Sequence, residues 1–275
     1  MPEPSTVVVT GGSSGIGLAT AKAFAARGAH VAIIARNPTK LEEAKAAIEA
    51  VRASTSQRVT TASADLSDGD ATIAAAEQLM TEGFLPDILV NSAGVIIPGE
   101  FITMSPDEFD HNVLHGFSSV VHSCRAFAPR MVERGSGHIV NVSSAGGFMS
   151  LYGYTGYSAA KFAVMGFTEA LRFEMKPQGV RVSVVCPPDT DTPGLAHERT
   201  LRPPETEKSA SITKPISPEF VAETIVRGVE KNKYYIIPGV PSRLALRLKG
   251  LWPELWFALV DSDVRKARRE RESGA

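Results

Sequence analysis

Three side chains in the second half of the sequence have types and spacing that suit proton transfer to a carbonyl oxygen. Tyr157 and Lys161 are four residues apart, so they share a face if this segment is helical. A tyrosine hydroxyl has an ordinary pKa near 10, and a neighbouring ammonium stabilises the phenolate, with a tenfold change in acidity corresponding to about 1.4 kcal/mol. Such a tyrosine can donate its proton as a hydride reaches the carbonyl carbon. Ser144 follows an apolar run and can donate a hydrogen bond to the same oxygen.

A glycine-rich turn near the start of the chain predicts a site for the phosphates of a dinucleotide. The apolar run 6–10 leads directly into the turn, and a helical pattern follows it. Glycines let the backbone approach a pyrophosphate, and a helix N-terminus adds free N–H groups and a partial positive charge. The strand before and the helix after separate this pattern from an ordinary glycine turn, and they make the common Tyr/Lys spacing more specific. The candidate cofactor-binding residues of this turn are Gly11, Ser13, Ser14, Gly15, Ile16 and Gly17.

The end of the second apolar run favours NADPH over NADH. It reads Ile34-Ala35-Arg36-Asn37, and Lys40 follows four residues beyond Arg36. An NAD-preferring site usually has Asp or Glu here, and a carboxylate repels a 2′-phosphate. Arg36 is suited to pair with that phosphate because a guanidinium matches its geometry. The alternative interpretation is a solvated surface arginine.

Short apolar runs alternate with helical patterns through most of the chain. Helices are expected from the glycine turn to Arg27 and over 41–51, with others between the later runs. Strict alternation of strand and helix predicts an α/β fold with a single doubly wound parallel sheet, a Rossmann fold with helices on both faces. The expected strands are 6–10, 30–35, 59–64, 88–91, 138–142 and 181–186.

Composition sets broad limits. The 275 residues, 43% hydrophobic, suit one large α/β domain, and a formal net charge of −1 gives no support for a nucleic-acid partner. Cys124 and Cys186 lie far apart without metal or redox spacing, which fits a reducing cytoplasm. The chain starts without the pattern of a signal peptide and has no stretch of about 20 apolar residues. We therefore expect a cytoplasmic protein.

Two segments depart from the alternating pattern. Residues 187–218 are rich in Pro, Thr and Glu, so regular structure is expected to lapse there, as in a lid or a disordered loop. From Leu244 the chain is apolar with scattered cations, and a basic cluster follows Val264. This pattern is typical of an amphipathic helix at a membrane surface, or of a helix packed on the domain or on a second subunit. We expect a catalytic domain over 1–240 with a lid at about 188–218, and an amphipathic tail over 241–275.

Taken together, these motifs resemble the short-chain dehydrogenase/reductase family over residues from about 6 to 230. The resemblance implies that Asp65 and the adjacent Leu66 lie at the adenine, and that Lys161 also holds the hydroxyls of the nicotinamide ribose. Proteins of similar fold commonly form homo-dimers or homo-tetramers. The motifs that carry the resemblance are Thr10-Gly11-x-x-x-Gly15-x-Gly17, Asp65, Asn91-Ser92-Ala93-Gly94, Ser144 and Tyr157-x-x-x-Lys161.

The same resemblance assigns two further segments to the cofactor. Asn91, Ala93 and Gly94 steady the central strand beside the ribose. The segment containing Pro187, Thr190 and Thr192 approaches the nicotinamide, although Pro188 stands where the family usually has glycine.

An unusual string narrows the resemblance to one subfamily. Pro187-Pro188-Asp189-Thr190-Asp191-Thr192-Pro193-Gly194 is followed by Glu198 and Pro204-Glu205-Thr206, and this is similar to the 3-ketodihydrosphingosine reductases. The resemblance implies NADPH-dependent reduction of 3-ketosphinganine to sphinganine in sphingolipid metabolism, with Ser144, Tyr157 and Lys161 as catalytic residues. The alternatives are a reductase of another hydrophobic ketone, such as a retinoid, steroid or fatty ketone, and a non-catalytic NADPH-binding sensor.

Two details bear on the site chemistry. The family has a catalytic Asn that holds a water in a proton relay, and this position falls on Gly116; either Asn112, one helical turn earlier, or a water substitutes, or the relay is impaired. His111 and His115 are spaced like metal ligands, but no third ligand accompanies them at a telling spacing. We interpret them as helix-surface residues and expect no metal.

Overall fold

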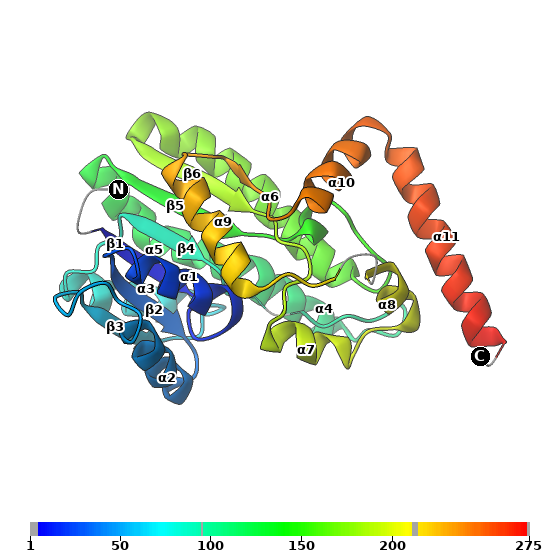
Figure 1. The fold of residues 1–275 in the computed structure, drawn as a ribbon, viewed down its shortest axis with the longest axis horizontal. Helices are drawn as coiled ribbons and strands as arrows, with labels where there is room; N and C mark the ends of the chain where they lie inside the picture. Colours follow the sequence, from blue (N-terminus) through cyan, green and yellow to red (C-terminus); the bar gives the residue numbers. More distant parts are fainter. Residues whose placement is uncertain (1–4, 95, 211–213, 274–275) are drawn as a thin grey trace.

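The computed structural model describes residues 5–94, 96–210 and 214–273 and is organised around one parallel β-sheet (Figure 1). Seven strands lie in the order β3-β2-β1-β4-β5-β6-β7, so the strand order reverses between β1 and β4. Such a reversal opens a crevice at the carboxyl ends of the strands. The predicted Rossmann sheet is therefore confirmed. The strands are β1 (Thr6–Thr10), β2 (His30–Ala35), β3 (Val59–Ser63), β4 (Ile88–Asn91), β5 (Gly137–Val142), β6 (Val180–Val185) and β7 (Tyr235–Ile236).

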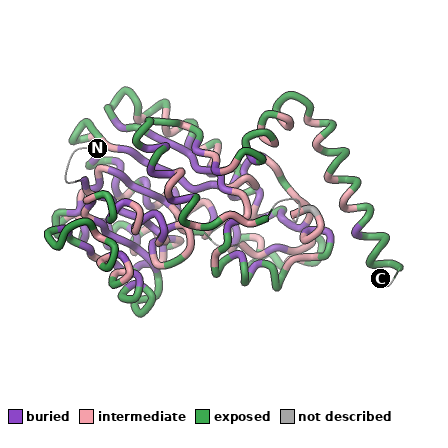
Figure 2. The backbone as a smooth tube through the Cα atoms, viewed as in Figure 1, coloured by how far each residue is buried: buried purple, intermediate pink, exposed green. Residues whose placement is uncertain are grey.

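Helices cover both faces of the sheet, which is why its central strands are continuous apolar runs. One hydrophobic cluster joins the sheet to α1 (Gly15–Ala25), α2 (Pro38–Glu49) and α9 (Pro218–Glu230). A second cluster joins the opposite face to α3 (Gly69–Thr81), α5 (Ser119–Arg134) and α6 (Thr155–Met175). Buried backbone is concentrated in these layers (Figure 2). Short 3-10 turns occur at Ala145–Gly147 and Lys176–Gln178.

Local capping explains where two helices begin. The helix expected from Leu41 starts earlier, at Pro38, because Asn37 Oδ1 accepts a hydrogen bond from Lys40 N at 3.0 Å. In the segment expected to be irregular, Thr192 Oγ1 accepts from Leu195 N at 3.1 Å. Prolines in the first turn then start helices instead of interrupting them. The expectation of irregular structure is therefore wrong for α7 (Pro193–Arg199) and α8 (Pro204–Ala210).

The C-terminal part of the chain forms two helices at the right of Figure 1, α10 (Val240–Leu251) and α11 (Pro253–Glu272). The α11 helix is exposed along most of its length and packs against α8 (Figure 2). Arg271 Nη1 lies 3.3 Å from the buried Glu205 Oε1 and 3.5 Å from Glu100 Oε1. Lys208 of α8 also forms an ion pair with Glu270. Ion pairs therefore fasten α11 to the α8 region.

No helix in the described ranges is both long enough and apolar enough to span a bilayer.

A π-helical turn, η1 (Leu114–Ser118), lies between α4 (Pro106–Val113) and α5 and packs on α6. Gly116 is buried in this turn, and a Cβ built on it would lie only 2.9 Å from Ala160 Cβ of α6. Atoms at that separation clash, so the close approach of η1 to α6 depends on glycine at this position. The family's asparagine cannot be restored at Gly116 without moving α6.

We expect Gly116→Asn to destabilise the protein by about 1–3 kcal/mol, the usual cost of overpacking a tight contact. Urea unfolding followed by circular dichroism measures this change. Gly166→Asn is the matched control, because a Cβ at Gly166 on α6 meets nothing within 4 Å. The double variant Gly116→Asn/Ala160→Gly should regain part of the loss. A Gly116→Asn protein as stable as its control would contradict the packing argument.

Candidate active site

A pocket of about 670 Å³ lies at the carboxyl edge of the sheet and gathers almost every residue predicted from the sequence. Asn91 is the one exception among them, since it is fully buried and does not line the pocket. The predicted residues that line it are Gly11, Ser13, Ser14, Gly15, Ile16, Gly17, Arg36, Lys40, Asp65, Leu66, Ala93, Gly94, Ser144, Tyr157, Lys161, Pro187, Thr190 and Thr192.

The glycine turn has the shape needed to cradle a phosphate. Gly11 has φ +68°, and a Cβ there would lie 2.7 Å from the Cα of Ala93, so the turn can approach the end of β4 only as glycine. A Cβ at Gly17 would lie 2.2 Å from the Gly11 carbonyl oxygen. Ser14 at the start of α1 makes no side-chain capping bond. The backbone N–H groups of the first helical turn are thus suited to an anionic ligand.

Charged side chains that follow β2 and β3 line one part of the pocket. Arg36 and Lys40 line the pocket there, together with Asp65. Burial raises the pKa of Asp65, but hydrogen bonds from Ser67 N at 3.0 Å and Ser67 Oγ at 2.8 Å outweigh it and hold the carboxyl below its ordinary pKa. Asp65 therefore stays charged, as an acceptor for an amine requires.

The interpretation of His115 as a helix-surface residue is wrong. Its side chain is 16% exposed, lines the pocket and places Nδ1 3.9 Å from Asp65 Oδ1. Burial lowers the pKa of His115. The sequence correctly indicated that His115 lies on a helix. The side chain faces the pocket because this part of the helix is a π-turn, which the sequence pattern did not predict. In the described ranges, no cluster of three or more His, Cys, Asp or Glu side chains has the geometry to hold a metal ion.

Asn91 supports the site from below. It is fully buried, and its Nδ2 donates to Asn141 Oδ1 at 2.8 Å and to Cys124 Sγ at 3.3 Å. Asn141 Nδ2 in turn donates to Thr168 Oγ1 on α6 at 3.0 Å. This network ties β4 and β5 to the helix that carries Tyr157. The steadying role implied for Asn91 therefore has a structural basis, whereas its side chain does not reach the pocket surface.

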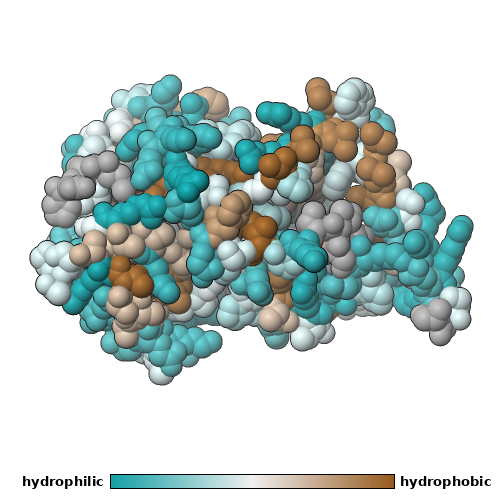
Figure 3. Space-filling model, in the orientation of Figure 1, coloured by the Kyte–Doolittle hydropathy of each residue, from teal (hydrophilic) through white to brown (hydrophobic). Residues whose placement is uncertain are grey.

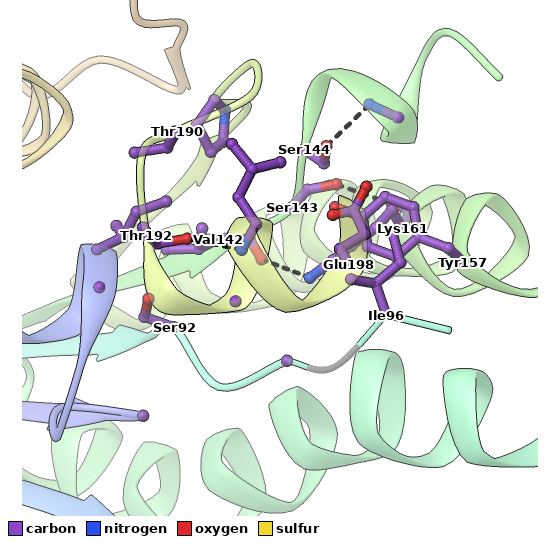
Figure 4. Close-up of a pocket in the computed structure, with 18 of the residues that line it drawn as sticks. Ser92, Ile96, Val142, Ser143, Ser144, Tyr157, Lys161, Thr190, Thr192 and Glu198 are labelled. Carbon is purple, nitrogen blue, oxygen red and sulfur yellow. Dashed lines mark hydrogen bonds between the residues drawn. The ribbon is translucent and has the colours of Figure 1, made fainter. Parts of the chain in front are cut away.

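Lys161 is the buried cation at the centre of the pocket (Figure 4). Only 5% of it is exposed, and its Nζ donates to the Val142 carbonyl oxygen at 3.3 Å. A Cβ at Gly94 would lie 3.3 Å from Nζ, so the absence of a side chain there leaves room for the ammonium. Burial lowers the pKa of Lys161 to about 8. Loss of its proton near neutral pH is thus less costly than for an exposed lysine.

Tyr157 and Ser144 complete the predicted chemical group. Lys161 Nζ lies 5.8 Å from the centroid of the Tyr157 ring, and Ser144 Oγ accepts a hydrogen bond from Gly146 N at 3.0 Å. The pKa of Tyr157 is raised, chiefly by burial and further by the carboxylates of Glu198 and Asp189, while a hydrogen bond to Ser144 lowers it. The depression expected from Lys161 is therefore not found. Desolvation of the phenolate outweighs it, and the phenol is fully protonated at neutral pH.

The side-chain amide of Asn112, one of the candidates for the relay, is occupied by the loop after β4. It is fully buried, its Oδ1 accepts from Ile97 N at 2.8 Å, and its Nδ2 donates to Ile97 O at 2.9 Å. Its amide therefore fixes the loop after β4. The three alternatives for the relay, which are Asn112, a water and an impaired relay, stay open.

Several pocket residues had no predicted role or a different one. Tyr154 and Glu198 line the substrate side. Trp256 of α11 also reaches the pocket, whereas its sequence context left contact with lipid and packing on protein as alternatives. Glu198 belongs to the string that narrowed the resemblance, but nothing in its spacing indicated that α7 turns it inward. Likewise, a helix-period pattern shows that α11 has an apolar face without showing which residues that face contacts.

Comparison with known proteins agrees with this geometry. Residues 5–202 match the short chain dehydrogenase family. The chain is 39% identical to the 3-ketodihydrosphingosine reductase of Bos taurus and 41% identical to that of Mus musculus, in each case over 83% of this chain and 69% of the relative. Among solved structures, a short-chain dehydrogenase from Sphingobium yanoikuyae in complex with NADPH superposes with a TM-score of 0.76 and 26% identity, covering 91% of this chain and 94% of that one.

Proposed function

This chain belongs to the short chain dehydrogenase family, and from that premise we propose that it reduces 3-ketosphinganine to sphinganine with NADPH, a step of sphingolipid biosynthesis. It is an oxidoreductase of that family. The observation that carries the proposal is the meeting of Ser144, Tyr157 and Lys161 with the glycine turn in one pocket. The names of the mammalian relatives support the choice of substrate.

The cofactor site is proposed to run from the glycine turn to Lys161. The first turn of α1 is suited to the pyrophosphate, and Arg36 with Lys40 to the 2′-phosphate. Asp65 and Leu66 are suited to the adenine, and Lys161 to the ribose hydroxyls beside the nicotinamide. When bound, NADPH supplies the hydride that reduces the ketone.

The protein's own contribution to the chemistry is control of one proton. Because burial keeps the Tyr157 phenol protonated, its hydroxyl is available to donate to the substrate's carbonyl oxygen. Ser144 can hydrogen-bond the same oxygen as negative charge develops there. Once the proton has left, the Lys161 ammonium and the Ser144 hydroxyl stabilise the phenolate.

The substrate side of the pocket suits an alkyl chain. It continues from Tyr157 past apolar side chains towards α10 and α11. These include Ile96, Met149, Leu151, Ala245 and Trp256.

We also propose the division of the chain into a catalytic domain, 1–240, and a tail, 241–275, with 188–218 acting as a lid. The described part of that segment supplies Leu195, Glu198 and Ala210 to the pocket wall. Movement of α7 and α8 would therefore open the substrate side while leaving the glycine turn in place.

The test of function is NADPH oxidation with 3-ketosphinganine against a panel of retinoid, steroid and fatty ketones. We expect 3-ketosphinganine to have the highest kcat/KM, and Tyr157→Phe to lose turnover by about a hundredfold or more, since the variant keeps the ring but has no proton to give. Tyr235→Phe, on an exposed tyrosine outside the pocket, is the control. A different preferred ketone would replace the proposed substrate. NADPH binding without turnover on any ketone would indicate a sensor.

Cofactor preference is tested with Arg36→Asp. Replacing a phosphate-pairing cation by a carboxylate should lower the ratio of NADPH to NADH affinity by about 10- to 100-fold, the range for a charge-assisted hydrogen bond. Fluorescence titration with each cofactor measures the ratio. Arg125→Asp, an exposed arginine on α5 outside the pocket, should leave it unchanged. A wild type that binds both cofactors equally would show that Arg36 is a solvated surface residue.

We further propose that the outer face of α10 and α11 contacts a membrane, where a long-chain ketone resides. Hydrophobic surface gathers over these helices in Figure 3. Trp252 is 61% exposed and Phe257 is 55% exposed, whereas Trp256 turns into the pocket. Arg268 and Arg271 lie near Glu205, so the apolar face and not these two arginines would make the contact. Large amphipathic aromatic side chains suit the interfacial region of a bilayer.

Substitution of the exposed aromatics tests this contact. Trp252→Glu/Phe257→Glu should reduce co-sedimentation with vesicles of mixed neutral and anionic lipid, because the variant loses apolar contact and anionic lipid repels its carboxylates. Turnover of a short, soluble ketone should persist. Phe173→Glu, on an aromatic of α6 that is 64% exposed, is the control. The alternative is that this face is a subunit interface, and size-exclusion chromatography tests it. In that case the wild type does not bind vesicles, and the double variant converts a dimer or tetramer into monomers.

A further inference from the structure

The substrate side of the pocket contains a carboxylate that the proton chemistry does not use. Glu198 lies on α7, lines the pocket and is 7% exposed. Figure 4 shows Glu198 and Tyr157 among the residues that line this pocket, and Tyr154, which donates a hydrogen bond to Glu198, has its ring centroid 5.6 Å from that of Tyr157. A carboxylate this deeply buried is costly unless hydrogen bonds or a cation stabilise it.

The two oxygens of Glu198 have different surroundings. Oε1 accepts hydrogen bonds from the Tyr154 hydroxyl and from Arg202 Nε, the latter at 2.7 Å, and it lies 2.6 Å from Arg202 Nη2. Oε2 accepts no hydrogen bond from any residue in the described part of the chain. The neighbouring side chains therefore fix the carboxylate by one oxygen and leave the other for a ligand donor.

The charge around Glu198 favours a cationic ligand. Arg202 also contacts Asp189 Oδ2 at 2.8 Å and Glu207 Oε2 at 3.2 Å, so one buried guanidinium serves three carboxylates. Asp189 lines the pocket with Glu198. Arg36 and Lys40 belong to the opposite end of the pocket, and Lys161 is directed at the Val142 carbonyl. Negative charge is therefore in excess on the substrate side.

We propose that Glu198 binds, through Oε2, the primary ammonium on the carbon next to the substrate's ketone, and so makes the enzyme selective for 2-amino ketones. This inference rests on the proposed function, because 3-ketosphinganine carries its amine at that carbon. Tyr154 and Arg202 are positioning residues that orient the carboxylate. A donor bound at Oε2 places the adjacent carbonyl near Tyr157, since amine and ketone are on neighbouring carbons.

The same arrangement links recognition to proton transfer. The negative charge of Glu198 contributes to the raised pKa of Tyr157, together with that of Asp189 and against that of Arg202. An ammonium bound at Glu198 offsets part of this negative charge. The phenol then becomes a stronger acid only when an amino ketone occupies the pocket, whereas a ketone without the amine lacks this help.

The experiment compares 3-ketosphinganine with the 1-hydroxy-3-ketone of the same chain length that lacks the amine. For the wild type we expect the amine-free ketone to have a KM about 10- to 100-fold higher than the amino ketone, the range for a charge-assisted hydrogen bond. Glu198→Gln keeps the shape and should raise the KM for the amino ketone by a similar factor, while the KM for the amine-free ketone stays within about threefold. Glu207→Gln is the control. Glu207 also pairs with Arg202 but does not line the pocket, so this variant should distinguish the two ketones as the wild type does.

Thermal unfolding and NADPH affinity confirm that each variant is folded. If the wild type reduces 3-ketosphinganine but does not distinguish the two ketones, the inference is overturned and the proposed function stands, and this comparison needs no variant. If Glu198→Gln raises the KM of both ketones equally, the inference is likewise overturned, because Glu198 would then act only in the structure of α7. A wild type that reduces other ketones but not 3-ketosphinganine would overturn both the inference and the proposed function.

Discussion

The Lys161 ammonium is buried at the carboxyl edge of the sheet, where desolvation disfavours its charge, and the surrounding structure is arranged to hold it there. The Val142 carbonyl oxygen at the end of β5 accepts a hydrogen bond from the ammonium, and Gly94 after β4 leaves space for it. Both strands end at this edge because the sheet is parallel. The hydrogen bonds among Asn91, Asn141 and Thr168 then fix α6, and thus Lys161 and Tyr157, relative to those strands.

Much of this arrangement could be predicted because it depends on short-range patterns. Buried strands are short runs rich in β-branched residues. The expected strands match β1, β2 and β4, and they differ from β3, β5 and β6 only at terminal residues. The glycine turn and the four-residue spacing on α6 are likewise local, so the predicted pocket residues other than Asn91 do meet. Their chemical roles as cofactor or catalytic residues remain predictions.

The wrong predictions concern features that depend on packing between residues distant in the sequence. The orientation of His115 depends on the π-turn η1, which packs closely on α6 at Gly116. No local sequence pattern around Gly116 predicts such a turn. The pKa of Tyr157 is raised chiefly by burial, and further by carboxylates that α7 and the loop before it bring from distant positions in the sequence. Thr192 and Pro193 could have indicated the start of α7, because a capping threonine before a proline is a local signal.

The ion pairs between α8 and α11 have a kinetic consequence. If 188–218 moves as a lid, the Arg271–Glu205 and Lys208–Glu270 pairs oppose the separation of α8 from α11. Opening would then require either breaking these pairs or displacing α11 as a body with its apolar outer face. Ions in solution weaken the more exposed Lys208–Glu270 pair more than the pair that Arg271 forms with the buried Glu205. Under the proposed lid, ionic strength would therefore change how readily α8 separates from α11, separately from any effect on hydride or proton transfer.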